Sequence, residues 1–457
     1  MARDTVDERP LEGIDQMVEW FTKGCKPKSE WRIGTEHEKF AFYTDDFSPV
    51  PYEGPNGIEA LLKGMEKELG WEAITDDGRI IGLAGTNGMG AISIEPGGQF
   101  ELSGAPLETI HQTCRESNQH LTAVKTVAKE LGISFLGTGS SPVWSLAETP
   151  KMPKSRYKIM TNYMPKVGTR GLDMMYRTAT IQVNLDFSDE LDMQRKLKTS
   201  LKLQPIASAL FANSPFTEGK PNGELSWRSG VWHDVDNQRG GYHPEMLEED
   251  YGFADYAKWC LDLPMYFIIR NGKYIDMTHI TFRQFMNGGA AKDLPGVTAT
   301  MGDWSNHVST VFPDVRLKQF LEMRGADGGP WRGICALPAF WVGLLYDEQA
   351  LGEAEAFVKD WSSDAVGQLR NDVPAKGLSA EINGISVLEI GREMLKISKG
   401  GLERRACLNK EGFDERLFLV PLEEVIAAKR TTAEHLLWMY SGPWQQDINR
   451  IYEEMAF

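Results

Sequence analysis

The sequence predicts an α+β fold, a mainly antiparallel β-sheet with helices packed on one side of it. Residues 180–187 alternate apolar and polar side chains, which is the pattern of a strand with one buried face. Pro96-Gly97-Gly98 separates two short strand-like segments and therefore predicts a hairpin turn. Long amphipathic runs at 107–131 and 191–211 predict helices that cover such a sheet.

The other elements follow from local signals in chain order. Glycine ends two of the helices, at Gly70 and Gly132. We expect helices at 11–21, 56–69, 107–131, 191–211, 349–369, 386–397 and 432–440, and strands at 32–40, 94–102, 133–137, 178–187, 265–270 and 320–324. No position divides the chain into two independent cores. Residues 1–457 are therefore predicted to form a single domain, mostly helical after about residue 348.

Composition excludes several classes of function. The chain has 457 residues, of which 41% are hydrophobic and 25% charged, as in soluble globular proteins. With 49 basic and 65 acidic side chains, the net charge is −16, which argues against nucleic acid or an anionic membrane as partner. The first ten residues, MARDTVDERP, lack the apolar core of a secretory signal and are too acidic for a transit peptide. We therefore expect a cytoplasmic enzyme.

Acidic side chains recur on the predicted strands. Because strand side chains alternate between faces, Glu36 and Glu38 point the same way, as do Glu322 and Arg324. Any single acid is more often a solvated strand residue. Several together, on strands whose opposite faces are expected to be apolar, predict a magnesium site that also binds a nucleotide phosphate. The candidate metal ligands are Glu36, Glu38, Glu95, Glu101 and Glu322.

Neutral polar groups and an arginine extend this candidate site. Gln182 and Asn184 share the polar face of their strand, although any half-solvated sheet shows such a face. Arg228 lies between Trp227 and Trp232, and aromatic neighbours hold a guanidinium rigidly against a carboxylate or phosphate. Surface salt bridges are the commoner role of arginine, but this setting favours a substrate anchor.

Two further arginines complete the set. Arg324 shares a strand face with Glu322, so a nucleotide phosphate is its expected partner, and Arg156 lies in an irregular stretch. The chain has neither a GxxxxGK[ST] P-loop nor a dinucleotide-binding glycine motif after a strand. If ATP is used, we expect it to bind through metal ions on the antiparallel sheet.

Several motifs resemble glutamate–cysteine ligases (γ-glutamylcysteine synthetases) of the plant and proteobacterial type. These motifs are GTEHEKF (34–40), IEPGGQFELSGAP (94–106), MMYRTATIQVNLDF (174–187), FANSPF (211–216), SWRSGVW (226–232) and FLEMRGADGGPWRGICALPAFWVGLLYD (320–347). The resemblance covers essentially the whole chain. It implies a curved antiparallel sheet with a glutamine synthetase-like catalytic core, and metals and ATP on its concave face.

The resemblance also implies the reaction, the first step of glutathione biosynthesis. ATP would phosphorylate the γ-carboxylate of L-glutamate, and the amine of L-cysteine would then displace phosphate. Two or three magnesium ions on the five candidate glutamates would neutralise the phosphates, with Glu38, Glu322 and Arg324 in catalytic roles. Arg156, Arg228 and Tyr266 are similar in context to the family's substrate-binding residues.

Two cysteines also match a feature of the family. Cys114 and Cys335 fall at positions that resemble a cysteine pair able to form a redox-responsive disulfide in the family, although cytosolic disulfides are uncommon. The implied partners are small molecules, and the implied state is a monomer or a weak homodimer. Residue types alone do not identify the amine acceptor. A related ligase with another amine, a guanidino-type kinase and a silent binding module are the alternatives.

Overall fold

The fold is dominated by one large β-sheet. A computed structural model describes residues 4–86, 88–290, 292 and 294–457. The strands of this sheet are β1 (Ile33–Tyr43), β2 (Glu72–Asp76), β3 (Arg79–Ala84), β4 (Ala91–Ile94), β5 (Phe100–Ser103), β6 (Ile133–Leu136), β7 (Thr180–Leu185), β14 (Val315–Leu317) and β15 (Leu321–Asp327). They lie in the order β14-β15-β7-β1-β5-β4-β3-β2, and β6 also pairs with β1. Every pairing is antiparallel, which confirms the predicted fold class.

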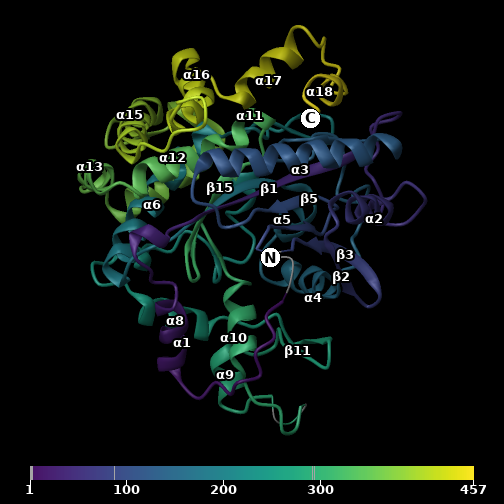
Figure 1. Cartoon of the computed structure of the whole chain (residues 1–457), viewed down its shortest axis with the longest axis vertical. Helices are drawn as coiled ribbons and strands as arrows, with labels where there is room; N and C mark the ends of the chain where they lie inside the picture. The colour runs from purple at the N-terminus through teal and green to yellow at the C-terminus, as the bar shows by residue number, and fades with distance from the viewer. Residues whose placement is uncertain (1–3, 87, 291, 293) are drawn as a thin grey trace.

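Long helices cover one face of the sheet, above it in Figure 1. They are α3 (Ile110–Glu130), α6 (Glu190–Leu210), α12 (Ala336–Leu345) and α15 (Val387–Arg405). α3 packs on β1 and β6, α6 packs on β15, and α12 packs between β7 and α15. The apolar side chains of β7 point into this layer, since Ile181, Val183 and Leu185 are fully buried.

Two glycines set the separation of α12 and α15. A Cβ on Gly401 would overlap the backbone carbonyl of Gly343, and a Cβ on Gly343 would overlap Ser398. The helices can therefore approach backbone to backbone only because neither position has a side chain. This contact ties the C-terminal helices to the layer that covers the sheet.

The remaining helices extend this layer or lie beyond the other face. They are α1 (Ile14–Thr22), α2 (Ile58–Leu69), α4 (Ser155–Tyr163), α5 (Gly171–Arg177), α7 (Trp227–Val231), α8 (Phe253–Asp262), α9 (Phe282–Met286), α10 (Met301–Val308), α11 (Trp331–Ile334), α13 (Glu348–Val358), α14 (Ser363–Lys376), α16 (Val420–Ala428), α17 (Thr432–Ser441) and α18 (Arg450–Glu454). In Figure 1, α1, α8, α9 and α10 lie together below the sheet. Within the described residues, no helix is long and apolar enough to span a bilayer.

Short strands complete the fold. They are β8 (Phe216–Thr217), β9 (Lys220–Pro221), β10 (Gly240–Gly241), β11 (Phe267–Arg270), β12 (Lys273–Asp276), β13 (Phe312–Pro313), β16 (Glu381–Ile382) and β17 (Ile385–Ser386). The segment 213–252 contains β8, β9, α7 and β10, and much of it is buried. It therefore forms a packed wall instead of an open surface loop.

Element boundaries follow local chemistry closely. Gly70 ends α2 in the left-handed conformation (φ 65°) that glycine adopts readily. The Thr109 hydroxyl accepts a hydrogen bond from the amide of Gln112 at 3.2 Å and starts α3. The predicted helix at 349–369 was wrong in one respect, because the chain breaks at Trp361 and Ser362 into α13 and α14. There the Ser362 hydroxyl accepts from the Ala365 amide and starts the second helix.

Candidate active site

A cavity lies over the face of the sheet that the long helices do not cover. The space open to ligand atom centres is about 130 Å³. Its charged lining consists of two glutamates and three arginines, while methionines and aromatic rings supply the apolar part. The lining residues are Glu38, Glu95, Pro96, Gln99, Arg156, Tyr157, Met160, Met174, Met175, Thr178, Thr180, Gln182, Arg228, Trp232, Phe267, Ser309, Thr310, Phe312 and Arg324.

Strand register builds a polar row across this face. Asn184 of β7 is paired with Gly34 on one side and with Glu322 on the other, and Glu322 is paired with Arg316 of β14. A Cβ on Gly34 would press on the Asn184 side chain, so glycine makes room for the amide. Asn184 Nδ2 in turn donates to Glu36 Oε1 at 3.2 Å. Polar residues far apart in sequence thus meet on four adjacent strands.

Carboxylates form a second cluster further along the sheet. Glu38 and Glu101 are direct cross-strand partners, and Glu95 follows β4 at the end of the same hairpin. Glu101 accepts hydrogen bonds from the hydroxyls of Ser93 (2.5 Å) and Ser103 (2.8 Å). Burial, and then the nearby charges of Glu95 and Glu101, raise the pKa of Glu38 well above its usual value.

Glu36 and Glu95 respond in the same way. Burial and the charge of Glu101 raise the pKa of Glu95, and burial and the charge of Glu322 raise that of Glu36. Raised values are typical of a carboxylate cluster without its counter-ions. Among the residues that the structure describes, no three His, Cys, Asp or Glu side chains are already gathered where one metal ion could bind. A shared cation would therefore require these carboxylates to turn toward it.

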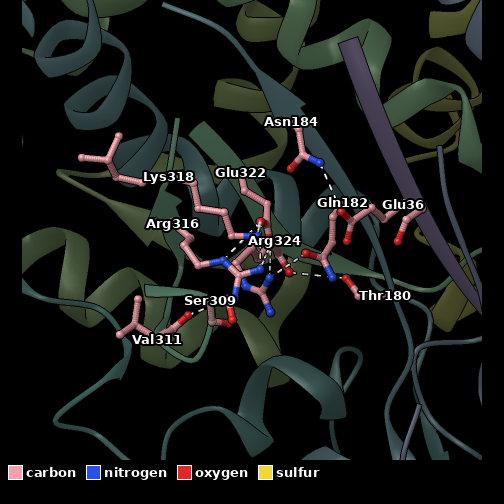
Figure 2. A network of polar contacts seen from close by, with 12 residues as sticks. Glu36, Thr180, Gln182, Asn184, Ser309, Val311, Arg316, Lys318, Glu322 and Arg324 are labelled. Carbon is pink, nitrogen blue, oxygen red and sulfur yellow. Dashed lines mark hydrogen bonds and ion pairs between the residues drawn. The ribbon is translucent and has the colours of Figure 1, made fainter. Parts of the chain in front are cut away.

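Glu322 has a different environment, because three cations surround its carboxylate (Figure 2). Arg316 binds it in bidentate fashion, with Nη2 donating to Oε1 at 2.7 Å and Nε donating to Oε2 at 3.1 Å, and Lys318 Nζ lies 3.1 Å away. Arg324 is its third ion-pair partner. Although burial alone would raise the pKa of Glu322, the charges of these partners hold it well below its usual value. The role of Glu322 as a metal ligand remains a prediction, and it would require exchange of at least one cation.

Arg324 is oriented by this cluster. Its Nη1 contacts Glu322 and donates to Gln182 Oε1 at 2.7 Å (Figure 2). Arg316 donates from its other side to the carbonyls of Ser309 and Val311 at 2.9 and 3.1 Å. Arg316 and Lys318 were not predicted. In the segment 315–318 they alternate with apolar residues, which is a strand pattern next to the predicted strand at 320–324. This pattern could have revealed them.

Arg228 reaches the cavity from the packed wall. Its side chain is 3% exposed, and its Nη2 donates to the carbonyl of Arg324 at 2.8 Å. The buried Asp327 holds the wall in place by accepting hydrogen bonds from Ser214 Oγ (2.7 Å) and Ser226 Oγ (2.8 Å). Asp327 also was not predicted, because its importance depends on loop contacts more than 100 residues away in sequence.

Of the two remaining candidates, Arg156 lines the cavity and Tyr266 does not. Arg156 lines the cavity from α4 and lies 3.6 Å from Asp4. Tyr266 does not line it: this ring is buried beneath Arg239, whose guanidinium carbon is 3.9 Å from the ring centroid. Its neighbour Phe267 lines the cavity instead. The substrate contact of Tyr266 thus remains a prediction without a supporting contact.

The reverse face of β1 corrects one expectation. Instead of being apolar, it carries the buried Lys39, whose Nζ lies 2.9 Å from His120 Nε2 of α3 and donates to the Phe100 carbonyl. Burial lowers the pKa of Lys39 to about 7. The neutral imidazole and the carbonyl explain how an amine can be accommodated there.

Cys114 of α3 and Cys335, between α11 and α12, are neighbours. Their thiols lie within hydrogen-bonding reach, and contact with Cys335 lowers the pKa of Cys114. Both are free thiols in the structure.

Comparison with known proteins identifies relatives of this chain. Glutamate–cysteine ligase B, chloroplastic, of Oryza sativa subsp. japonica is 51% identical over 457 residues, which cover 98% of this chain and 90% of the relative. The chloroplastic glutamate–cysteine ligase of Arabidopsis thaliana is 52% identical over 443 residues, covering 97% and 83%. These names contradict the expectation of a cytoplasmic protein, because they point to the plastid.

A solved structure supports the fold. The glutamate–cysteine ligase of Francisella tularensis in complex with AMP matches 93% of this chain and 89% of its own, with a TM-score of 0.55 at 12% identity. The model of glutamate-cysteine ligase family 2 (GCS2) matches residues 32–454. The chain therefore belongs to glutamate-cysteine ligase family 2, whose glutamine synthetase-like fold it shares.

Proposed function

We propose that this chain is an ATP-dependent carboxylate–amine ligase that joins the γ-carboxylate of L-glutamate to the amine of L-cysteine. Family membership supports this reaction. The observation that carries it is the meeting of two glutamates with three arginines in one cavity (Glu38, Glu95, Arg156, Arg228 and Arg324). Such a site can bind an anionic substrate and a transferring phosphoryl group together.

The first step activates a carboxylate, which by itself is a poor electrophile. A γ-carboxylate oxygen attacks the terminal phosphorus of ATP, the bond to ADP breaks, and γ-glutamyl phosphate forms. Arg324, held by Glu322 and Gln182, points a fixed guanidinium at this transfer. Arg156 and Arg228 are the proposed anchors for the carboxylates of glutamate.

The second step forms the amide. The amine nitrogen attacks the acyl carbon, the C–O bond to phosphate breaks, and the nitrogen loses a proton. Met160, Met174 and Met175 line one part of the cavity. Thioethers pack well against sulfur and apolar groups, so this wall suits an acceptor with a small thiol side chain better than it suits ammonia.

Magnesium fits the carboxylates of this site. Oxygen ligands are those that a hard cation prefers. Burial, and then neighbouring carboxylates, raise the pKa values of Glu36, Glu38 and Glu95, and a bound cation would favour their charged forms. Glu36, Glu38, Glu95 and Glu101 would hold the ions, with Glu322 as a further candidate, and two or three ions are expected. When bound, they would neutralise the ATP phosphates.

The proposal extends to organisation and regulation. Residues 1–457 would act as one catalytic domain, because a continuous buried cluster runs from Leu11 to Ile426. We expect a monomer or a weak homodimer. The adjacent thiols of Cys114 and Cys335 support a redox-responsive disulfide.

The test is ADP release with magnesium, ATP and L-glutamate, with and without L-cysteine, and with mass identification of the product. Cysteine-dependent ADP with one γ-glutamylcysteine per ADP is expected. Equal turnover with ammonia or another amine would contradict the assigned acceptor, and ADP without an amide product would indicate a kinase. Arg324→Lys should lower turnover, because Arg324 lines the cavity. Its control, Arg332→Lys on the surface, should leave turnover unchanged.

A further inference from the structure

A second, smaller cavity lies behind the arginines of the first, and we call it the side chamber. It lies between α6, α7, α14, β13 and β15. The residues that line it are Gln204, Pro205, Ser208, Arg228, Ser229, Trp232, His233, Phe312, Pro313, Asp314, Arg324, Gly325, Arg370 and Val373. Arg228, Trp232, Phe312 and Arg324 line both cavities, so the two share a wall.

The side chamber contains buried polar groups without hydrogen-bond partners. Gln204 of α6 is 2% exposed, yet neither its amide nitrogen nor its amide oxygen has a partner. Trp232 Nε1 and His233 Nε2 are likewise buried and unpaired. Leaving a buried polar group unpaired costs free energy, so such groups usually have a partner. Four such atoms, on three residues that line one cavity, therefore point to a polar ligand.

Charge indicates the sign of that ligand. Three guanidinium groups line the side chamber (Arg228, Arg324 and Arg370), against the single carboxylate of Asp314. That carboxylate is already paired with Arg370 Nε at 2.7 Å. Burial lowers the pKa of His233 to about 4, so its imidazole is neutral near pH 7 and adds no charge to the side chamber. Arg324 is likewise paired with Glu322, whereas the guanidinium of Arg228 hydrogen-bonds only the Arg324 carbonyl among the described residues. Arg228 therefore leaves a positive charge that suits an anion.

The volume of the side chamber limits which anions fit it. The space open to ligand atom centres is about 30 Å³. One water needs about 10–15 Å³ on this measure. The side chamber therefore exceeds one water and suits the few oxygen atoms of a tetrahedral oxyanion, whereas a nucleobase would not fit.

We propose that the side chamber binds the inorganic phosphate released when the amine displaces it from γ-glutamyl phosphate. This inference rests on the proposed function. Phosphate would pass from the main cavity along Arg228 and Arg324, which line both spaces, and would then accept hydrogen bonds from Gln204 Nε2 and Trp232 Nε1. Moving phosphate out of the main cavity would prevent it from attacking the carbonyl carbon of the new amide and reversing the step.

Direct binding of inorganic phosphate to the free, full-length protein tests the proposal. Isothermal titration without ATP or amino acids should show one saturable site. Gln204→Met keeps the length of the side chain and removes both amide atoms, so phosphate affinity should fall about tenfold. Gln349→Met, on exposed α13, is the matched control and should bind phosphate like the wild type. His233→Phe provides a second variant should Gln204→Met fold poorly.

The outcomes separate this inference from the proposed ligase reaction. Equal affinity in the wild type, Gln204→Met and His233→Phe would overturn the side chamber as the phosphate site, even if γ-glutamylcysteine is made. Displacement of phosphate by magnesium-free ADP would also overturn it, by assigning the site to the nucleotide. Phosphate binding that needs Gln204 and survives ADP would support it, even if the ligase assay fails.

Discussion

Replacing Glu322 with glutamine would remove the only carboxylate that Arg316, Lys318 and Arg324 all contact among the described residues. Glu322 is fully buried, and the side chains of Arg316 and Lys318 are 8% and 7% exposed. Removing one partner of a buried ion pair costs about 3–5 kcal/mol, because the remaining charges stay buried without compensation. We expect Glu322→Gln to lower the free energy of unfolding by about that amount.

Urea unfolding, measured without magnesium, gives this quantity directly. Glu424→Gln is the control, because Glu424 forms a 3.0 Å pair with Arg332 in which both side chains are more than half exposed. Such a pair contributes roughly 0–1 kcal/mol. Turnover of Glu322→Gln should also fall, on the order of a hundredfold, since Arg324 loses its anchor.

The dependence on pH supplies an independent check. The pKa of Glu322 is held well below its usual value, so its stabilising effect is complete above the unfolded-state value of about 4.3. The difference in stability between the wild type and Glu322→Gln should be constant from pH 6 to 8 and should shrink below about pH 4. Two results together would refute the ion-pair reasoning and favour Glu322 as a metal ligand: Glu322→Gln lowers the free energy of unfolding by less than about 0.5 kcal/mol, and excess magnesium restores its activity.

Three further predictions concern other parts of the molecule. Gly401→Ala should destabilise the protein by about 1–3 kcal/mol in urea unfolding because α15 must move away from α12, whereas Gly352→Ala, in open space on α13, should be neutral or stabilising. Equal effects of the two changes would contradict the close helix contact. Mild oxidation should join Cys114 to Cys335 and alter turnover, and mass spectrometry that finds both thiols free would exclude the bond. Arg228→Ala should mainly raise the apparent KM for an amino acid or ATP, and unchanged kinetics would remove it from the site.

Much of the fold could be predicted from local patterns. The alternation of Ile181, Val183 and Leu185 with polar residues identified β7 and the face of it that is buried. Glycine and the Pro96-Gly97-Gly98 turn placed helix ends and the hairpin, and Gly98 does adopt a positive φ of 86°. These signals depend only on neighbours in sequence, which is why they were informative.

Contacts between distant segments could not be predicted in this way. Glu322 was expected to bind metal because it is one of several acids on the predicted strands, but its environment depends on the register of β14 against β15. Tyr266 and Phe267 are adjacent, and only tertiary packing decides that Phe267 lines the cavity. Lys39 lies on the reverse face of β1 by simple alternation, but its burial there depends on His120 of α3, which lies beside it.

The order of strands in the sheet has a consequence for how the chain folds. β1, β7 and β15 are neighbours in space, yet Glu36 and Asn184 lie 148 positions apart in sequence and Gln182 and Arg324 lie 142 apart. During synthesis, one edge of β7 remains unpaired until β15 has left the ribosome. Such long-range pairing is slow and exposes aggregation-prone edges. Chains interrupted before about residue 327 would lack the cavity, and should depend on chaperones to remain soluble.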